Sequence, residues 1–438
     1  MRKIAAAAAL ATLVGAGAAG ASPLRYPATV TQATGGMRVS TQADPDALLT
    51  GVQIFVEAGL ERQTAATNGA AALTAECVAR TPVAVAGASQ PLRDAIASLG
   101  GSLDYTIEDD NVHYYIEARP DRMPQVLALF GTALAHPDFS AATLPAARAE
   151  IVRHAGDGEH NPLHVGVQMF KESFLEQGSA YPEYGTAGSV SQMQPEAVRS
   201  FHDRTYRRGA VWASVAGRST PAIDAALGSV ARDLPDGTLP ALDVKARPIP
   251  ATAPRIVAQR DIARPFVVLG FAAPAPGSKD FGAMLILQSM MQTAFQASSA
   301  TTVLPNDRAI GTFYMFDSVP ASLVVYVNGG TGVDPSLALR AIILLSKAMS
   351  DKPLGADSLR RFQTQAEGAF VTDTTTLADR SYVVGSLAAG ALADRSINGA
   401  VEAIESATGA DVQRVAKTYL QRYIVAFVLP RAGSAQSD

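Results

Sequence analysis

Two similar stretches of sequence decide the fold of this chain: PEAVRSF at residues 195–201 and GADVQRV at residues 409–415. Val198 in the first stretch aligns with Val412 in the second, 214 positions later in a chain of 438 residues. The offset is close to half of the chain. It indicates an internal repeat, with one copy in each half.

Each half of the repeat is predicted to open and close on an apolar strand. The opening strands are predicted at residues 51–56 and 266–271, and the closing strands at residues 210–215 and 424–429. A chain of this length is too long for one hydrophobic core and suits two domains. We predict an α+β fold of two structurally similar halves, each a mixed, mainly antiparallel sheet packed against helices.

A proline-rich segment separates the two predicted domains. Residues 234–254 contain five prolines, and proline disfavours helix and stiffens an extended chain. We predict a linker there, between an N-terminal domain at residues 22–233 and a C-terminal domain at residues 255–438.

The first 21 residues have the pattern of a secretory signal peptide. A basic start at residues 1–3 precedes an apolar run at residues 4–14 and a small-residue end at residues 19–21, which is the order that export requires. We expect cleavage before Ser22 and a periplasmic or secreted protein. No later uncharged segment reaches the roughly 20 apolar residues of a membrane span, so none is expected in the mature chain.

The composition excludes two further possibilities. The formal net charge is −4, and basic and aromatic residues do not cluster, so we expect no nucleic-acid partner. Cys77 is the single cysteine, so no internal disulfide can form. Its place in an apolar helix favours a buried thiol over a reactive one.

Four landmarks follow one another along the first half of the chain. They are an apolar segment at residues 48–60 followed by a helix at residues 68–78, LGGSLD at residues 99–104, HPDF at residues 136–139 before RAEI at residues 148–151, and YPEYGT at residues 181–186. In their order and spacing they resemble the pitrilysin/insulinase family of zinc peptidases. The resemblance implies that family's fold.

The family's catalytic motif is missing from the helix at residues 68–78. In the family this helix carries H-x-x-E-H, in which two imidazoles bind zinc and the Glu deprotonates water. The two His positions and the Glu position correspond to Ala72, Glu76 and Ala75 respectively. Sliding the alignment by one residue places Leu73, Glu76 and Cys77 there instead. Neither alignment rebuilds the motif.

The resemblance leaves one further candidate ligand, Glu150, which is similar to the family's third zinc ligand. Catalytic zinc normally needs three protein ligands and a bound water, and one carboxylate cannot replace two imidazoles. We therefore predict a non-peptidase homologue without zinc or another cofactor.

A second candidate site lies in the C-terminal half. Residues 307–314 resemble the family segment in which an Arg and a Tyr flank a glycine turn. In relatives that are heterodimers, one subunit carries zinc and the other supplies this pair, which can stabilise an oxyanion. Arg308 and Tyr314 are the candidates, although a strict count places Asp307 where the Arg belongs. The alternative is a surface arginine and a tyrosine packed on the sheet.

Three histidines, His154, His160 and His164, lie close together in the sequence. The spacing of His160 and His164 would suit a metal site on a helix. However, Asn161 and Pro162 interrupt a helix between them. We predict a solvated loop with incidental histidines.

Three functions remain open. The first is a catalytically degenerate subunit that pairs with a zinc-bearing relative as a heterodimer, encloses a chamber for peptides and supplies Arg308 and Tyr314. The second is a stand-alone binding or scaffolding protein. The third is an active peptidase with an unrecognised site. The first is favoured because the resemblance implies that a closed chamber needs two double-domain units, and this chain is long enough for one.

Overall fold

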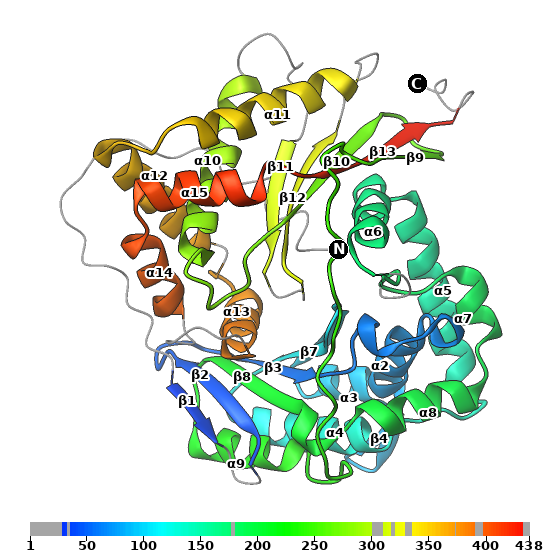
Figure 1. The fold of residues 1–438 in the computed structure, drawn as a ribbon. Helices are drawn as coiled ribbons and strands as arrows, with labels where there is room; N and C mark the ends of the chain where they lie inside the picture. Colours follow the sequence, from blue (N-terminus) through cyan, green and yellow to red (C-terminus); the bar gives the residue numbers. More distant parts are fainter. Residues whose placement is uncertain are drawn as a thin grey trace.

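The computed structural model describes residues 29–32, 36–176, 180–299, 310–316, 320–328, 335–372, 374–389 and 397–431. The predicted signal peptide and Arg308 lie outside these residues. The described residues form two large β-sheets, each covered by helices, one in the lower and one in the upper part of Figure 1.

The N-terminal sheet has six strands in the order β1-β2-β8-β3-β7-β6. β2 and β8 are parallel, and the other neighbouring pairs are antiparallel. The strands are β1 (Thr29–Gln32), β2 (Arg38–Ala43), β3 (Thr50–Val56), β6 (Ser102–Ile107), β7 (Val112–Ala118) and β8 (Val211–Gly217), beside a separate hairpin of β4 (Pro82–Val85) and β5 (Ala88–Pro91).

The C-terminal sheet has five strands in the order β11-β12-β10-β13-β9. Read from β9, this order corresponds to β2-β8-β3-β7-β6, and the parallel pair, β9 and β13, occupies the matching place. The strands are β9 (Arg255–Arg260), β10 (Phe266–Ala272), β11 (Ile310–Met315), β12 (Ser322–Asn328) and β13 (Ile424–Pro430). The prediction of two similar, mainly antiparallel halves is confirmed.

The helices follow the same repeat. In the N-terminal half they are α2 (Ala70–Arg80), α3 (Leu92–Ser98), α4 (Met123–Ala135), α5 (Leu144–His160), α6 (Pro162–Phe174), α7 (Ala187–Gln192), α8 (Pro195–Thr205) and α9 (Pro221–Val230), with short 3₁₀ turns η1 (Leu60–Arg62), η2 (Ala65–Thr67) and η3 (Arg208–Ala210). In the C-terminal half they are α10 (Phe281–Ser299), α11 (Pro335–Asp351), α12 (Ala356–Thr372), α13 (Leu377–Ala389), α14 (Ile397–Ser406) and α15 (Gly409–Tyr419). The two helices that contain the repeated stretches, α8 and α15, begin 214 residues apart.

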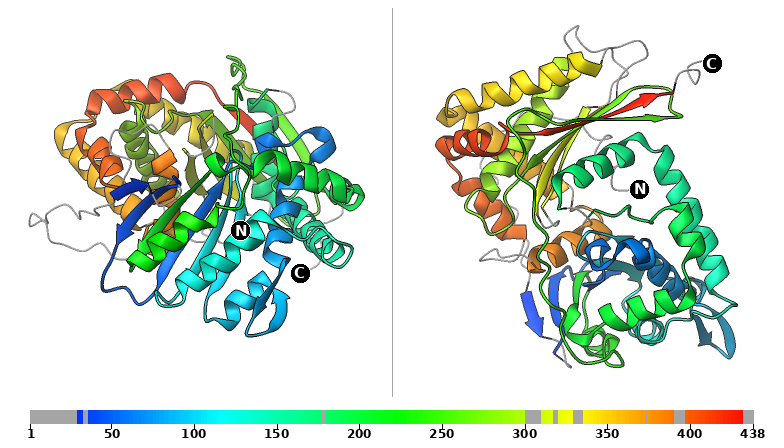
Figure 2. Two further views of the ribbon diagram at one scale, coloured as in Figure 1. Left: turned by 90° about the horizontal axis from the view of Figure 1, so that it is seen from below. Right: turned by 45° about the vertical axis from the view of Figure 1, so that its right-hand side comes forward.

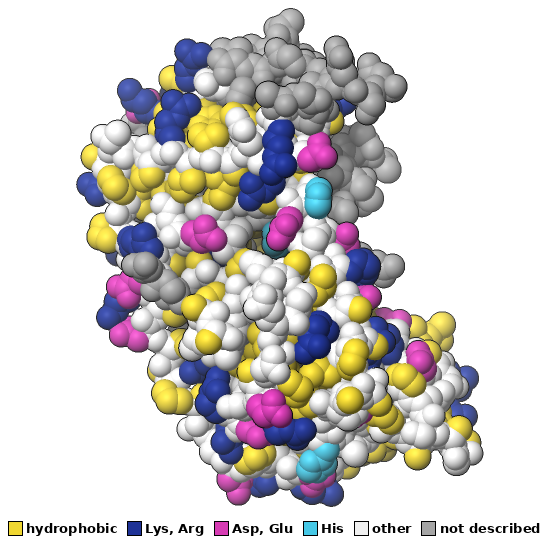
Figure 3. Space-filling model, turned by 90° about the vertical axis from the view of Figure 1, so that its right-hand side faces the viewer, with side chains coloured by type: hydrophobic (Ala, Val, Ile, Leu, Met, Phe, Trp, Pro, Cys, Tyr) yellow, Lys and Arg dark blue, Asp and Glu magenta, His cyan; other side chains and the backbone are white. Residues whose placement is uncertain are grey.

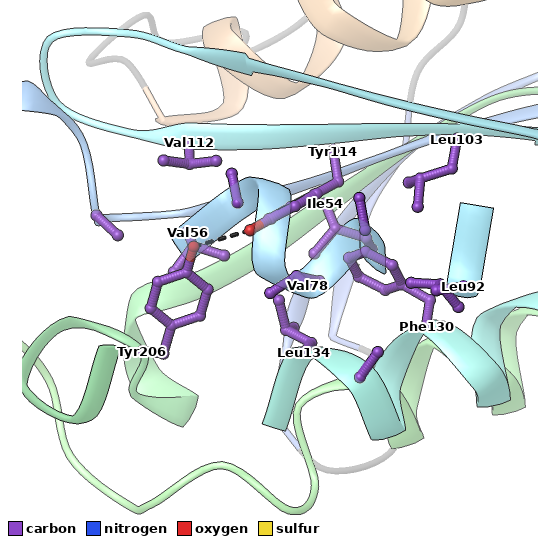
Figure 4. Close-up of a cluster of buried hydrophobic side chains, with 14 of the residues drawn as sticks. Ile54, Val56, Val78, Leu92, Leu103, Val112, Tyr114, Phe130, Leu134 and Tyr206 are labelled. Carbon is purple, nitrogen blue, oxygen red and sulfur yellow. Dashed lines mark hydrogen bonds between the residues drawn. The ribbon is translucent and has the colours of Figure 1, made fainter. Parts of the chain in front are cut away.

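One face of the N-terminal sheet packs against α2, α3 and α4 to form the core in Figure 4. Ile54 and Val56 of β3 point to this face because alternate side chains of a strand share one side. Tyr114 and Tyr206 are buried in the same core, and their hydroxyls share a hydrogen bond of 2.8 Å. Burial raises the pKa of both phenols, so both remain neutral.

The opposite faces of the two sheets are covered by an exchange of helices. α13 from the C-terminal half packs on β3 and β8, where the Trp212 indole donates a 3.1 Å hydrogen bond to the Gly385 carbonyl. α6 from the N-terminal half packs on β10 and β13, and the Phe170 ring covers Gly270. Figure 2 shows both helices lying between the two sheets. Each half therefore completes the packing of the other.

Residues 231–254 contain no helix or strand, apart from an isolated bridge between Ala246 and Leu175. Among the described residues, no helix is long and apolar enough to cross a membrane.

Candidate functional site

α2, the helix that aligns with the family's zinc motif, is closed off from solvent. All of its residues from Ala70 to Ala79 are buried. The Gln63 side chain accepts hydrogen bonds of 3.0 Å from the backbone N–H groups of Gly69 and Ala71, which would otherwise be unpaired at a helix start. Gly69 has φ +99°, and a Cβ there would lie 2.6 Å from Val190 of α7. This close approach seals the start of α2.

The residues at the motif positions are buried. Ala72 and Ala75 are 0% exposed and Glu76 is 1% exposed. In the alternative alignment Leu73 and Cys77 are also 0% exposed. An imidazole at any of these positions would have to displace its neighbours, because protein interiors are close-packed.

Glu76 is the centre of a buried ion-pair cluster. Its Oε1 pairs with Arg80 Nε on the next turn of α2, and its Oε2 lies 3.3 Å from Arg93 Nη2 of α3. The Tyr105 hydroxyl of β6 donates a 2.8 Å hydrogen bond to Oε2. Burial raises the pKa of Tyr105, and the neighbouring Glu76 raises it further, so the phenol remains a donor. Both carboxylate oxygens of Glu76 are thus occupied by structural contacts.

Cys77 provides no ligand either. Burial, followed by the charge of Glu76, raises the pKa of its thiol to about 12. A thiolate, which is the form that binds metal, is therefore not available near neutral pH. The location agrees with the buried thiol predicted from the sequence.

Glu150 pairs with residues of its own helix. On α5, its Oε1 lies 2.6 Å from Arg153 Nη2 and 3.1 Å from His154 Nε2. The hydrogen bond from Arg153 lowers the pKa of Glu150. Within the described ranges, no three His, Cys, Asp or Glu side chains are grouped so that they could hold a metal ion. The residues at the motif positions and Glu150 do not fit a catalytic zinc ion.

The three histidines lie at a corner between two helices, so the predicted loop is wrong. α5 extends to His160, and α6 begins at Pro162. Asn161 separates them and caps α6 by accepting hydrogen bonds from the backbone N–H groups of Leu163 and His164. The break at Asn161 and Pro162 was predicted, but a proline at the first turn starts a helix as readily as it ends one.

The residues at this corner line a pocket of about 450 Å³. It is bounded by the end of α5, the start of α6, the loop before α7 and the ends of β9 and β13. Its lining residues include His154, Glu159, His160, His164, Glu172, Tyr184, Arg260, Asp261 and Arg431. Figure 3 looks onto this side of the molecule and shows histidine and acidic side chains beside a hollow.

Tyr314 of β11 is 8% exposed and points into the C-terminal core. Its hydroxyl donates a hydrogen bond to the Pro274 carbonyl, and burial raises its pKa. Phe281 and Phe316 pack around its ring. In this arrangement the phenol is a packed side chain of the sheet.

A second charged pair, in which Asp109 is buried and Lys171 is partly exposed, was not predicted from the sequence. Lys171 of α6 lies 2.6 Å and 2.8 Å from the two carboxylate oxygens of Asp109. Burial alone would lower the pKa of Lys171, but Asp109 raises it above its ordinary value. Nearby, both carboxylate oxygens of Glu61 are buried without a hydrogen-bond partner among the described residues. No sequence motif marks these residues, because the contact joins segments about 60 residues apart.

The sequence of the N-terminal half matches a known family. Residues 38–182 match the model of the family described as insulinase (peptidase family M16). No curated protein sequence matches the chain.

Solved structures extend the similarity to most of the chain. A protease from Helicobacter pylori has a TM-score of 0.80 at 13% identity, covering 92% of this chain and 99% of its own. A peptidase M16 inactive domain from Pseudomonas fluorescens has a TM-score of 0.77 at 15% identity, covering 94% and 100%. A chain of complex III2 from Candida albicans has a TM-score of 0.74 at 11% identity, covering 93% and 97%. At these identities the likeness shows the fold.

Proposed function

We propose that this chain, a homologue of the insulinase-type peptidases (family M16) over residues 38–182 and with their fold, is a non-catalytic subunit that pairs with a zinc-bearing relative. The observation that carries the proposal is the environment of Glu76. A carboxylate bonded to Arg80, Arg93 and Tyr105 in a closed core neither binds zinc nor deprotonates water.

The partner supplies the chemistry in this proposal. The described residues form one pair of similar halves whose inner sheet faces are filled by α6 and α13. A peptide chamber of the kind that the family resemblance implies is enclosed by two such units, so the second unit would carry zinc. The predicted signal peptide would bring the pair together in the periplasm or outside the cell. Fractionation of cells would test that location.

A contribution of Arg308 and Tyr314 to the partner's site is the finer part of the proposal. Tyr314 could reach a substrate only after its hydrogen bond to the Pro274 carbonyl breaks. If the pair acts on the transition state, Arg308→Ala or Tyr314→Phe would lower the partner's turnover about tenfold or more without affecting assembly.

The experiment is co-expression of this chain with a zinc-bearing relative from the same genome. We expect a 1:1 complex by light scattering, with an interface of at least about 1,600 Å² in total. The complex should cleave peptides in a chelator-sensitive reaction, and the chain alone should neither cleave them nor hold stoichiometric zinc. Absence of a complex, or zinc-dependent cleavage by the chain alone, would overturn the proposal.

A scaffolding role is the second candidate. It is favoured by the similarity in fold to a chain of complex III2 from Candida albicans. The distinguishing result is the nature of the partner: capture of a protein that does not have a peptidase fold, with no effect on peptide cleavage, would support scaffolding. The third alternative, an active peptidase with an unrecognised site, predicts cleavage by the chain alone.

A further inference from the structure

A cluster of charged side chains lies where α6 meets the N-terminal sheet. α6 packs on β10 and β13 of the C-terminal sheet, and a Cβ at Gly166 would lie only 2.5 Å from the Val268 side chain. From the same helix, Lys171 pairs with Asp109 in the turn between β6 and β7 of the N-terminal sheet. This ion pair therefore links the C-terminal sheet, through α6, to the N-terminal sheet.

The 3₁₀ turn η1 places Glu61 against the same β6–β7 turn. The backbone N–H of Glu61 donates a 2.8 Å hydrogen bond to the Asp109 carbonyl. Gly59, two residues earlier, approaches so closely that a Cβ there would lie 2.4 Å from the Asn111 backbone nitrogen. The backbone of η1 is therefore fixed beside the turn, and the charges of Asp109 and Lys171 act on the Glu61 side chain.

The Glu61 carboxylate has no hydrogen-bond partner in this cluster. Both of its oxygens are buried and accept no hydrogen bond from the residues that the structure describes. Burying a carboxylate without donors is costly, and the cost is much larger for the charged form than for the neutral form. The geometry therefore favours a protonated Glu61 as long as α6 contacts the β6–β7 turn.

The neighbouring cations do not compensate a negative charge on Glu61, because each is already bonded to another carboxylate. The charged groups that face Glu61 are Asp109, Asp110, Lys171 and Arg62, and Glu108 and Glu183 lie near Lys171. Lys171 contacts both carboxylate oxygens of Asp109, and Arg62 donates a 3.3 Å hydrogen bond to Glu57. An ionised Glu61 would therefore add a further negative charge beside carboxylates.

The direction of the pH dependence follows from this environment. Burial, together with Asp109 and Asp110, raises the pKa of Glu61 from 4.5 to about 8. A carboxyl group that is open to water has its ordinary pKa. The closed contact between α6 and the turn therefore binds the Glu61 proton more tightly than an open arrangement does, and it is favoured at low pH.

We propose that Glu61 is a proton-controlled latch between α6 and the N-terminal sheet. While Glu61 is protonated, the Lys171–Asp109 pair keeps α6 against the β6–β7 turn. When Glu61 releases its proton to solvent, its carboxylate takes up water and α6 moves away from the turn. The inference concerns this chain alone and does not depend on the proposed pairing.

The test is a distance measurement between α6 and the N-terminal half at pH 6 and pH 9. Nitroxide labels at Glu172→Cys on α6 and Ala97→Cys on α3 occupy exposed positions, while Cys77 is 0% exposed and stays unlabelled. Pulsed electron paramagnetic resonance should show a single short distance at pH 6 and a second, longer distance at pH 9. The ratio of open to closed molecules should rise about a hundredfold, because opening changes the pKa of Glu61 from about 8 to 4.5.

Variants in the labelled chain separate the latch from a general effect of pH. Glu61→Gln stays neutral and should show the short distance at both pH values. Lys171→Met removes the ion pair and should show the longer distance already at pH 6. Glu196→Gln changes an exposed glutamate on α8 and should behave as the wild type. Thermal unfolding checks that each variant is folded. An unchanged distance distribution in the wild type, or the same pH response in Glu61→Gln, would overturn the proposal.

Discussion

Both α2 and the α5–α6 corner carry glutamate side chains, but those at the corner are exposed to solvent, whereas Glu76 of α2 is buried. Glu76 on α2 is 1% exposed and bonded to three partners. Glu172 at the corner is exposed beside a pocket of about 450 Å³. The comparison teaches that the position that aligns with the family's zinc motif and the positions of solvent-exposed charged groups are different places in this chain.

The largest expected effect comes from rebuilding the motif in the closed region. The triple substitution Ala72→His, Ala75→Glu and Glu76→His inserts larger side chains into a packed core and removes the centre of an ion-pair cluster. Overpacking costs about 1–3 kcal/mol and breaking a buried pair about 3–5 kcal/mol. We expect a loss of at least about 4 kcal/mol in the free energy of unfolding, measured by urea denaturation.

The outcome of that rebuilding also tests whether α2 is closed in solution. A triple variant that unfolds at the wild-type urea concentration and binds one zinc ion per chain would show that the core around α2 accommodates a metal site. Zinc content would be measured by mass spectrometry after dialysis.

A matched pair of substitutions compares the two regions directly. Glu76→Gln leaves Arg80 and Arg93 without their shared carboxylate, although both arginines are partly exposed. We expect a loss of about 2–4 kcal/mol. Glu172→Gln at the corner should change stability by less than about 0.5 kcal/mol, as exposed positions usually do. Similar losses from both in urea denaturation would mean that burial does not separate the regions.

Much of the fold could be predicted from the sequence because the same order of a helix and an apolar strand recurs in each half of the chain. The alignment of Val198 with Val412 identified α8 and α15, and the strands that follow them, as equivalent elements. Backbone pairing within each half depends on such patterns. The exchange of α6 and α13 between the halves could not be predicted. Phe170 contacts Gly270, but these residues are far apart in the sequence, and a local sequence pattern gives no information on such a contact.

At the candidate site, the sequence predicted only that the zinc ligands of the motif are absent. Ala72 and Ala75 exclude the zinc ligands by their side chains alone. A lone Glu76 in an apolar helix does signal a need for partners, but Arg93 and Tyr105 are two of many polar residues that could have supplied them. The prediction of a loop at the histidine corner was wrong because Pro162 opens α6 directly after the capping residue Asn161.

Glu61 provides an intermediate case, since its carboxylate oxygens are buried but lack the partners of Glu76 among the described residues. Burial, together with Asp109 and Asp110, raises its pKa from 4.5 to about 8. The folded state holds this proton more tightly, so the stability that it contributes is present below pH 4.5 and is lost as the pH rises through about 8. Glu61→Gln should therefore be about 1–3 kcal/mol more stable than the wild type at pH 8.5 and nearly equal at pH 4. Parallel curves of unfolding free energy against pH for the two proteins would contradict this.

The last comparison between the two regions is expected to perturb the protein least. It compares the rate at which Cys77 of α2 is chemically labelled with the rate at which His160 of the corner is labelled. With a pKa of about 12, roughly one Cys77 thiol in ten thousand is ionised at pH 8, and the side chain is 0% exposed. Iodoacetamide should leave the native chain unlabelled over hours and add one group per chain in urea. Diethylpyrocarbonate, in contrast, should modify the exposed His160 rapidly in the native chain, with His160→Gln as the matched control. Native labelling of Cys77 at a rate close to that in urea would mean that α2 opens frequently by local unfolding, and the distinction between a closed and an open region would then fail.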